Sequence, residues 1–287
     1  MTDDPFVAHR SLLFTVAYEM LGSAADAEDV LQESWLRWDG VDQAQVRDPR
    51  AYLVRIVTRQ ALNRLRSLAR SREDYVGEWL PEPLLTAPDV AEDVELAESV
   101  SIAMLTVLET LGPTDRAVFV LREVFELPYG EIAEVVGKSA ASVRQIAHRA
   151  REHVAARRPR MQVSRSEQEA VVERFTEALR TGELQDLLQV LAPDVVLVAD
   201  GGGVVRAVLT PVSGVEAVAA LLSRMDRSGD YALTATWVNG APAVRVRIGG
   251  QLAAVSLQVE NGRISRIYTM VNPHKLTHLG APAELAR

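Results

Sequence analysis

Apolar residues recur at helical spacing through the first quarter of the chain. Ser23 and Asp26 stand in capping-box spacing at the start of one predicted helix. Its buried stripe follows at i, i+3, i+4, i+7 and i+11 and comprises Ala27, Val30, Leu31, Ser34 and Trp38. A later helix begins at Pro49, because proline suits a first helical turn. Its inward positions are predicted to be Tyr52, Ile56, Ala61 and Leu65. The pattern predicts an all-helical unit over residues 1–72.

Residues 129–158 contain two short amphipathic patterns separated by a glycine. The first ends at Gly137, and Ser139 can cap the second. The apolar face of the second pattern comprises Val143, Ile146, Ala147, Ala150 and Val154. The outer faces carry Arg144, Gln145, His148, Arg149 and Arg151. Two helices joined by a tight glycine turn, the second basic on its outside, are typical of a helix-turn-helix.

The pattern changes after about residue 164. Helical periodicity at 165–181, 184–192 and 214–226 is mixed with alternating β runs. Three two-residue turn signals separate the last four β runs: Asn239-Gly240, Gly249-Gly250 and Asn261-Gly262. They predict a four-stranded antiparallel meander. Two earlier β runs, "VVLVAD" and "VVRAVL", bracket a glycine triplet. The C-terminal part is therefore expected to be an α+β domain with a curved antiparallel sheet.

A proline-containing acidic stretch lies between the first helical unit and the next. It includes "EWLPEPLLTAPDVAEDVE", which has the composition of a linker. Several of its residues are too apolar to be left in water, namely Trp79, Leu80, Leu84 and Leu85. We therefore expect the linker to dock on another part of the chain. The sequence predicts four units: 1–72 all-α, 73–97 linker, 98–160 all-α with the helix-turn-helix, and 161–287 α+β.

Charge is strongly patterned, although the net charge is −8. Residues 49–72 hold seven arginines and no acid, residues 73–115 hold eleven acids and no base, and residues 136–160 hold seven Lys/Arg against one glutamate. Basic islands of this kind favour binding to nucleic-acid phosphates. The basic face of 49–72 taken alone is equally consistent with a solvated surface, as is the acidic face of 24–38. A plain helical hairpin is the alternative to the helix-turn-helix.

Composition excludes several protein classes. Apolar residues make up 48% and charged residues 24% of the chain, which is ordinary for a globular protein. The absence of cysteine excludes disulfides, zinc–thiolate fingers and iron–sulfur clusters. No apolar run approaches the roughly 18 residues of a membrane span, and the first residues lack the features of a signal peptide. We expect a cytoplasmic protein.

Three stretches carry a family resemblance. "DAEDVLQESWLR" resembles the core-polymerase-binding helix in region two of sigma-70 type initiation factors. "AYLVRIVTRQALNRLR" is similar to the following part of that region, which opens and holds the −10 element. "LPYGEIAEVVGKSAASVRQIAHRARE" is similar to region four, which binds the −35 element. Two such regions joined only by a linker resemble the small extracytoplasmic-function sigma factors, over residues 5–158.

The resemblance implies a transcription initiation factor that binds core RNA polymerase and promoter DNA, with no cofactor and no catalysis. Core polymerase would contact Asp26, Asp29, Gln32, Glu33 and Trp35. The −10 element would contact Arg55, Arg59, Asn63, Arg64 and Arg66. The −35 element would contact Ser142, Arg144, Gln145, His148 and Arg149. Because "VRQIA" at 143–147 differs from the "VKSRL" of most members, their promoter preference is not transferred.

A narrower resemblance covers nearly the whole chain. One group of these sigma factors carries a SnoaL-like C-terminal domain marked by "WLPEP", "DGGG" and "NPDKL" motifs. Here the three stand at 79–83, 200–203 and 272–276, with His274 in place of the aspartate. The resemblance implies that the appended domain regulates in cis, against the linker and region two, so that no dedicated anti-sigma protein is expected. The implied interdomain residues are Trp79, Leu80, Pro81, Asp200, Gly201, Gly202, Gly203, Asn272, Pro273, Lys275 and Leu276.

Several alternatives stay open for the glycine triplet. A phosphate loop is disfavoured, since neither G-x-x-x-x-G-K-[ST] nor G-x-G-x-x-G is present. Asp200 is a candidate general base with Tyr231 or His274 nearby, as in SnoaL-like cyclases. The triplet could instead be a simple turn between two strands. We favour a contact surface in which Asp200 pairs with an arginine of region two or the linker.

Three alternatives stay open for the whole chain. The chain could be a helix-turn-helix regulator that binds DNA without core polymerase. It could be a ligand-sensing DNA-binding regulator that holds a small molecule in the C-terminal pocket. It could also be a SnoaL-like cyclase or isomerase fused to a DNA-binding domain. His274 and His278 have the i, i+4 spacing of two metal ligands on a helix, but the sequence offers no third ligand.

Overall fold

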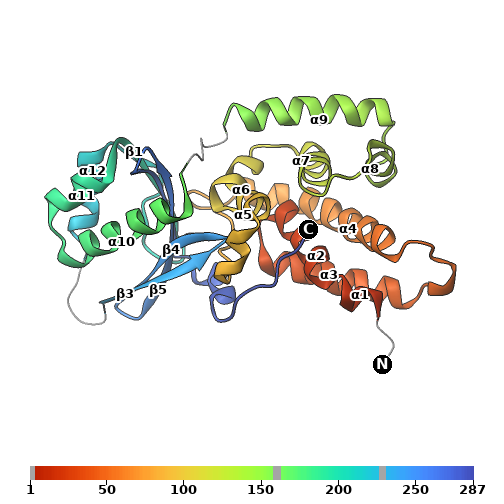
Figure 1. Ribbon diagram of the computed structural model, residues 1–287, viewed down its shortest axis with the longest axis horizontal. Coiled ribbons are helices and arrows are strands. Elements are labelled where there is room, and N and C mark those ends of the chain that lie inside the picture. The colour runs from red at the N-terminus through yellow and green to blue at the C-terminus, as the bar shows by residue number, and fades with distance from the viewer. Residues whose placement is uncertain (1–3, 158–162, 226–230) are drawn as a thin grey trace.

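Two α-helical units and a sheet domain make up the molecule, and the linker lies between the helical units and the sheet (Figure 1). The computed structural model describes residues 4–157, 163–225 and 231–287, with the side chains of 69–73 excepted. The first helical unit contains α1 (Pro5–Ala8), α2 (Arg10–Leu21), α3 (Ala24–Asp39), the 3₁₀ turn η1 (Gln43–Gln45) and α4 (Pro49–Glu73). Helix α2 is buried from Leu12 to Leu21 because α3 and α4 both pack against it.

The predicted helix α3 is confirmed, and the predicted face of α4 needs a correction. All five stripe residues of α3 are buried, and the Ser23 hydroxyl accepts the N–H of Asp26. In α4, Ala61 and Leu65 are buried as predicted, but Tyr52 and Ile56 are only half-buried. The residues buried there instead are Leu53, Val54, Val57 and Thr58. The reason is that α4 packs on two sides, against α2 and α3 and also against the helix-turn-helix unit.

The second helical unit confirms the predicted helix-turn-helix. The linker forms η2 (Pro88–Glu92) and α5 (Val94–Val100), followed by α6 (Ile102–Leu108), α7 (Pro113–Phe119) and the π-helical turn η3 (Val120–Val124). Helix α8 (Tyr129–Val136) ends at Gly137, whose φ is +70°. Helix α9 (Ala140–Ala155) begins under the Ser139 hydroxyl, which accepts the N–H of Ser142.

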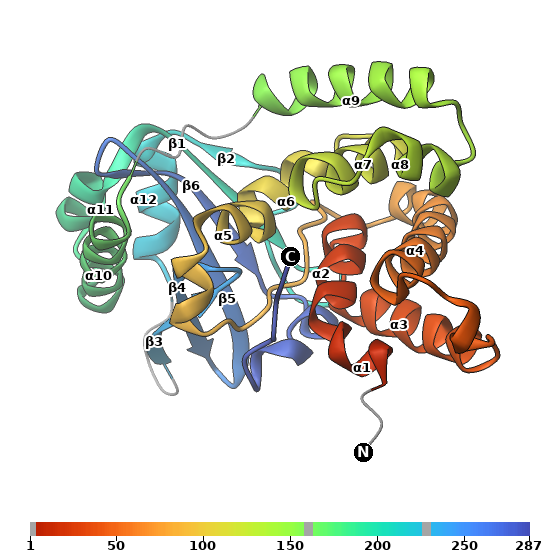
Figure 2. The ribbon, with the colours of Figure 1, turned by 45° about the vertical axis from the view of Figure 1, so that its right-hand side comes forward.

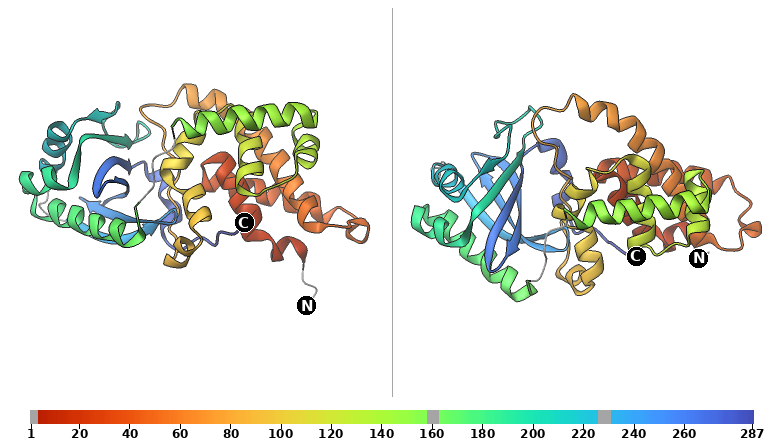
Figure 3. Two further views of the ribbon diagram at one scale, coloured as in Figure 1. Left: turned by 45° about the horizontal axis from the view of Figure 1, so that its top comes forward. Right: turned by 90° about the horizontal axis from the view of Figure 1, so that it is seen from above.

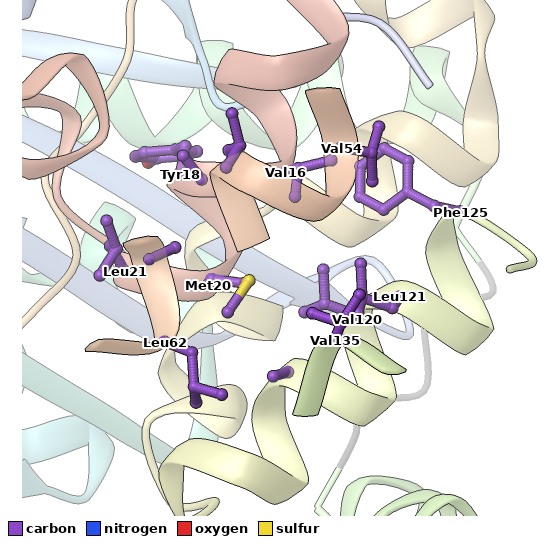
Figure 4. Packing of buried hydrophobic residues seen from close by; sticks show 14 of the residues in the cluster. Val16, Tyr18, Met20, Leu21, Val54, Leu62, Val120, Leu121, Phe125 and Val135 are labelled. Atoms are coloured by element: carbon purple, nitrogen blue, oxygen red, sulfur yellow. The ribbon is translucent and has the colours of Figure 1, made fainter. Parts of the chain in front are cut away.

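One hydrophobic core joins the two helical units. It combines residues of α2 and α4 with residues of η3 and α8 (Figure 4). Val16, Met20, Val120 and Leu121 are fully buried in it. Close packing of this kind excludes water from the core itself. In this conformation the two units therefore form a single body rather than two tethered domains.

The C-terminal domain is a six-stranded sheet covered by three helices. Its elements are α10 (Arg165–Thr181), α11 (Leu184–Val190), β1 (Leu191–Asp200), β2 (Val212–Ser213), α12 (Val215–Ser223), β3 (Tyr231–Val238), β4 (Ala241–Ile248), β5 (Gln251–Glu260) and β6 (Arg263–Met270). The strand order is β2-β1-β6-β5-β4-β3, and β1 pairs parallel with β6. The predicted antiparallel meander is confirmed as β3 to β6.

One predicted strand is wrong. Residues 204–209 form a turn and irregular chain, so the glycine triplet does not join two strands. The N–H groups of Val204 and Val205 both bond to the carbonyl of Gly201, which turns the chain away from the sheet. The edge of β1 that such a strand would use pairs instead with the short β2.

The two faces of the sheet have different neighbours. Helices α10, α11 and α12 cover one face, while the linker and α6 cover the other (Figure 3). On the linker side, Leu80, Ile102, Val238 and Met270 belong to one buried cluster. The predicted docking of the linker is confirmed by this cluster.

The chain after β6 returns to the helical units. The turns η4 (Pro273–Lys275) and η5 (Thr277–Leu279) lead to a C-terminal segment that runs back along α2 (Figure 2). The N–H of Ala286 donates to the Thr15 hydroxyl at 3.1 Å. The Arg287 guanidinium pairs with Asp93 at 3.1 Å and with Glu95. The C-terminal domain thus touches the helical part through the linker, α6, the turn between β3 and β4, and this last segment.

Candidate functional site

Asp200 lies at the end of β1, fully buried, and faces the linker. Its carboxylate accepts three hydrogen bonds. The Tyr75 hydroxyl donates at 2.6 Å, the Leu80 N–H at 2.8 Å and the Lys275 ammonium at 2.7 Å. A buried carboxylate needs such donors, because the loss of hydration is otherwise costly. The partner is therefore a lysine of the C-terminal domain itself, and the predicted pairing with an arginine of region two or the linker is wrong.

Lys275 completes the same arrangement from η4. Its ammonium also donates to the carbonyl of Leu80 at 2.6 Å, and it lies 3.9 Å from the centroid of the Trp79 ring. Cation–π contacts of this kind are strongest when water is excluded, and Lys275 is almost fully buried. The paired strands β1 and β6 bring η4 to Asp200, since the N–H groups of Val271 and Asn272, just after β6, bond to the Asp200 carbonyl at the end of β1. We call the following residues the clasp: Tyr75, Trp79, Leu80, Asp200, Asn272 and Lys275.

The glycine triplet allows the linker to approach closely. Gly202 has a φ of +58°, and an added Cβ would collide with the Asn272 amide and lie 2.9 Å from the Tyr75 hydroxyl. Gly203 has a φ of +72° and faces the Val76 side chain. Burial raises the pKa of the Tyr75 phenol, and the bond to Asp200 raises it further. The phenol therefore stays protonated and acts as a donor to Asp200.

The linker also caps the helix predicted to contact core polymerase. The Glu82 carboxylate accepts the Ser23 hydroxyl at 2.8 Å and the N–H groups of Ala24 and Ala25 at 2.8 and 3.1 Å. A carboxylate at a helix N-terminus accepts hydrogen bonds from otherwise unpaired N–H groups, and its negative charge interacts favourably with the positive end of the helix dipole. Glu82 was not predicted from the sequence. Its only sequence signal is an acid inside an otherwise apolar motif.

A turn residue of the sheet forms a second polar contact with the linker. Asn239, with a φ of +54°, is fully buried between β3 and β4. Its amide donates to the Tyr18 hydroxyl and to the Val100 carbonyl, both at 2.7 Å, and accepts the Leu84 N–H at 2.9 Å. The sequence identified Asn239 only as a hairpin turn residue. The alternation of apolar and polar residues in the flanking strands contains no signal that Asn239 contacts the helical units.

Two ionisable groups are buried at the junction of the helical units. The Arg116 guanidinium of α7 donates to the Glu19 carbonyl at 3.0 Å and pairs with the Glu109 carboxylate. The Glu19 carboxyl accepts the Ser99 hydroxyl at 2.7 Å, while its other oxygen has no hydrogen-bond partner among the described residues. Burial raises the pKa of Glu19 to about 8. Burial lowers the pKa of Arg116 to about 9, which leaves it charged at neutral pH.

The residues predicted to contact the −35 element share one exposed face. Ser142, Arg144, Gln145, His148 and Arg149 are all exposed on α9. Their ion pairs are loose, at 3.4 Å between His148 and Glu152 and 4.0 Å between Arg149 and Asp115. Exposed pairs of this kind are worth little and exchange readily. This face of α9 is therefore accessible to a partner.

The residues predicted to contact the −10 element and core polymerase instead pair with other parts of the chain. Arg55 and Arg59 both contact Glu134 of α8. The Arg55 guanidinium lies 3.4 Å from the Glu134 carboxylate, and the Arg59 guanidinium donates to the Glu134 backbone carbonyl at 2.9 Å. The Arg64 guanidinium pairs with Asp26 and, at 3.3 Å, with Asp29. The Glu33 carboxylate accepts a bond from Gln60. The remaining members of the two sets are exposed: Gln32, Trp35, Asn63 and Arg66.

The structure does not assemble the residues considered for catalysis. Asp200 faces the linker, the Tyr231 hydroxyl donates to the Leu179 carbonyl, and His274 is exposed. The strand end directs Asp200 to the face of the sheet opposite the three helices, which is why the predicted catalytic set does not meet. Because the His274 side chain is exposed, its replacement of aspartate leaves the Asp200–Lys275 pair intact.

The described residues offer neither a metal site nor a membrane span. Within residues 4–157, 163–225 and 231–287, no group of three His, Cys, Asp or Glu could hold a metal ion. Over the same described ranges, no helix combines the length and apolar character required to cross a membrane.

Comparisons with known proteins agree on one family. The chain matches the Sigma-70 region 2 model over residues 6–71 and the Sigma-70 region 4 model over residues 101–154. It is 37% identical to the ECF RNA polymerase sigma factor SigJ of Mycobacterium tuberculosis (strain ATCC 25618 / H37Rv), over 98% of this chain and 95% of that protein. It is 35% identical to the probable ECF RNA polymerase sigma factor SigI of M. tuberculosis (strain CDC 1551 / Oshkosh), over 96% and 94%.

A solved structure agrees over the same length. The crystal structure of the M. tuberculosis extracytoplasmic function sigma factor SigJ matches with a TM-score of 0.76 and 32% identity, covering 96% of this chain and 98% of that chain. The expected resemblance to extracytoplasmic-function sigma factors with an appended domain, and the fold of two sigma regions followed by a SnoaL-like domain, are confirmed. The chain therefore belongs to the extracytoplasmic-function family of RNA polymerase sigma factors, the alternative sigma factors of promoter-specific transcription.

Proposed function

We propose that this sigma factor is regulated in cis by its C-terminal domain, which holds a closed conformation through the clasp. In the closed conformation, Asp200 and Lys275 hold the linker at Leu80, and Glu82 of the same linker caps α3. The state of the clasp is thereby connected to the helix that would dock on core polymerase. The buried three-donor environment of Asp200 is the observation that carries this proposal.

The closed conformation is unsuited to reading a whole promoter. The −10 and −35 elements lie about 25 base pairs apart, which is about 85 Å along straight DNA at about 3.4 Å per base pair. The unit that contains α9 shares a hydrophobic core with α2 and α4, which holds the two DNA-contacting units against each other rather than at this spacing. Initiation then requires the units to separate on the polymerase.

The closed contacts also occupy residues needed for the −10 element. Arg55 and Arg59 are held by Glu134 of α8, next to the recognition helix. Opening would release both guanidinium groups for phosphates and unpaired bases. We propose that Arg55, Arg59, Asn63, Arg64 and Arg66 then bind the −10 element. The five exposed α9 residues bind the −35 element, and the α3 set from Asp26 to Trp35 binds core polymerase.

The proposal divides the chain by role. Residues 1–72 and 98–160 act on polymerase and promoter, residues 73–97 are the linker that the clasp grips, and residues 161–287 form the regulatory domain. Because the closed contacts lie within one chain, the mechanism requires no dedicated anti-sigma protein.

Transcription in vitro with core RNA polymerase tests this mechanism without any ligand. Tyr75→Phe removes the hydroxyl that bonds to Asp200 and Asn272 while keeping the ring. Each of these two hydrogen bonds is worth about 1 kcal/mol, so the closed conformation should lose about 2 kcal/mol. Promoter-specific transcript should therefore rise about 30-fold wherever opening limits initiation.

The matched control is Tyr231→Phe, which removes one phenolic hydroxyl bond inside the C-terminal domain. It should leave transcript levels unchanged. Equal transcription from the parent chain and Tyr75→Phe would contradict cis regulation through the clasp. Absence of a promoter-specific transcript from either chain, on a library of host promoters, would contradict the assignment of promoter-reading residues.

A further inference from the structure

The C-terminal domain contains a cavity on the face of the sheet opposite the clasp. Its volume is about 570 Å³, and its walls come from α10, α12, the inner face of the sheet and residues 206–208. Phe175, Leu197, Leu222 and Ile267 are among the apolar residues that line it. A cavity of this size and character fits a drug-sized ligand, for which pockets of about 300–1,000 Å³ are usual.

The polar lining that the structure describes is sparse and contains no acidic group. Among the described lining residues, only Arg206 and Thr269 carry polar side-chain groups, and none is a carboxylate, an imidazole or a phenol. Arg206 is exposed as well as lining the cavity, so it marks the end that meets solvent. The walls therefore favour an apolar body, and the rim favours an anionic group beside the guanidinium.

The cavity and the clasp share the same two short segments. Successive side chains of a strand point to opposite faces. Accordingly Ala199 lines the cavity while Asp200 faces the linker, and Thr269 lines the cavity while Met270 packs beside Leu80. The alternation continues past the end of β6, where Val271 lines the cavity and Asn272 bonds to Tyr75.

The loop after the glycine triplet connects the two sites directly. Gly202 and Gly203 lie against Tyr75 and Val76 of the linker. Only a few residues later, Arg206 and Val208 form part of the cavity wall. A molecule that displaced this wall would move the glycine turn that the linker packs against. Coupling needs such a shared element with two arrangements.

We propose that the cavity is a sensory site for an apolar monoanion, such as a medium-chain carboxylate, and that its occupancy loosens the clasp across the sheet. This inference rests on the proposed regulation in cis, because it supplies the signal for opening. The carboxylate binds beside Arg206, the chain fills the apolar cavity, and the ligand displaces residues 201–208 from the linker. The closed conformation therefore binds the ligand less tightly than the open one.

Calorimetric titration of the full-length chain with decanoate, and with decanol as the uncharged analogue, tests the site. Decanoate should bind, and it should bind up to about fivefold more tightly than decanol, the upper end of the range for an ion pair at a solvent-exposed rim. Arg206→Gln should abolish this difference while decanol binding persists. Arg180→Gln, which alters a surface arginine of α10 paired with Glu177, is the matched control and should preserve it.

Reciprocal coupling tests the link to the clasp. If the ligand opens the clasp, a weaker clasp must strengthen ligand binding by the same factor. Tyr75→Phe should therefore tighten decanoate binding about 30-fold, the worth of the two hydrogen bonds that its hydroxyl makes. Tyr129→Phe, in the helix-turn-helix unit, is the control and should leave the affinity unchanged.

The outcomes separate this inference from the proposed regulation. Absence of binding by decanoate and decanol, or an equal affinity of the parent chain for both, would overturn the sensory site. Binding of decanoate that Tyr75→Phe leaves unchanged would overturn the coupling. The ligand-free transcription assay with Tyr75→Phe stands apart from both results, so cis regulation can succeed where the ligand proposal fails.

Discussion

The two interfaces that close this molecule differ in their polar content. Regions two and four meet through an apolar core, in which Met20, Val120 and Leu121 are fully buried. The C-terminal domain meets the linker through an apolar cluster that includes Leu80 and, beside it, through the buried charged and polar atoms of the clasp. Apolar burial is non-directional and tolerates change. A buried ion pair contributes less net stability, but it fails sharply when one partner is lost. The clasp is therefore the better place for a switch.

The largest expected effect comes from breaking the clasp. Asp200→Ala leaves Lys275 buried without its anion, so we expect a loss of about 3–5 kcal/mol in the free energy of unfolding. Asp200→Asn combined with Lys275→Met should lose less, because it removes both charges. Urea unfolding measures these losses, with Asp194→Ala, an exposed acid on the same strand, as the control. Equal losses from the single and double variants would show that charge is unimportant here.

The apolar interface should respond in proportion to volume. Leu121 is fully buried, and Leu121→Ala should cost about 2–5 kcal/mol through the cavity that it leaves. Leu121→Met keeps the volume and should cost less than about 1.5 kcal/mol. Urea unfolding of both variants gives the comparison. A loss from Leu121→Met as large as that from Leu121→Ala would contradict a tolerant, non-directional interface.

The buried Glu19 makes the apolar interface sensitive to pH. Burial raises the pKa of Glu19 to about 8. At a pH above the ordinary pKa of a glutamate, the folded chain therefore still holds a proton that the unfolded chain has released. Folding stability, compared with Glu19→Gln, should fall by up to about 1.4 kcal/mol per pH unit between about pH 5 and pH 8. It should level off above pH 8. Thermal unfolding across this range tests the prediction, and parallel curves for the two proteins would disprove it.

The smallest effect on stability is expected at the surface contact between the two regions. Arg55 pairs with Glu134 at 3.4 Å in a partly exposed position, and such pairs contribute about 0–1 kcal/mol. Arg55→Ala should therefore barely change the urea midpoint. It should nevertheless reduce transcription that depends on the −10 element. A variant with normal transcription would remove Arg55 from the DNA-contacting set.

Local pattern was sufficient for most of the secondary structure. The periodicity of α3, the Gly137 turn of the helix-turn-helix and the three hairpin turns of the meander all appear in the sequence as they do in the fold. These features depend on neighbours within a few residues, which the sequence displays directly. The run at 204–209 was misjudged because β-branched residues favour strands only where a partner strand is available.

The contacts of the site were visible only in part. The motifs at 79–83, 200–203 and 272–276 indicated where the domains meet, but they did not show that Asp200 binds Lys275 rather than an arginine. Tyr75, Glu82 and Asn239 gave almost no sequence signal for their roles. The same is true of Arg116, buried between the two helical units.

By itself the sequence determined the elements, the basic and acidic blocks and the family of this protein, since each is encoded by short-range pattern. Only the tertiary structure decided which polar groups meet. Tyr75 reaches Asp200 across 125 positions, and Asn239 reaches Tyr18 across 221. Such pairs form because packed surfaces bring distant segments together, and a buried polar atom must then bond to whichever partner the packing supplies.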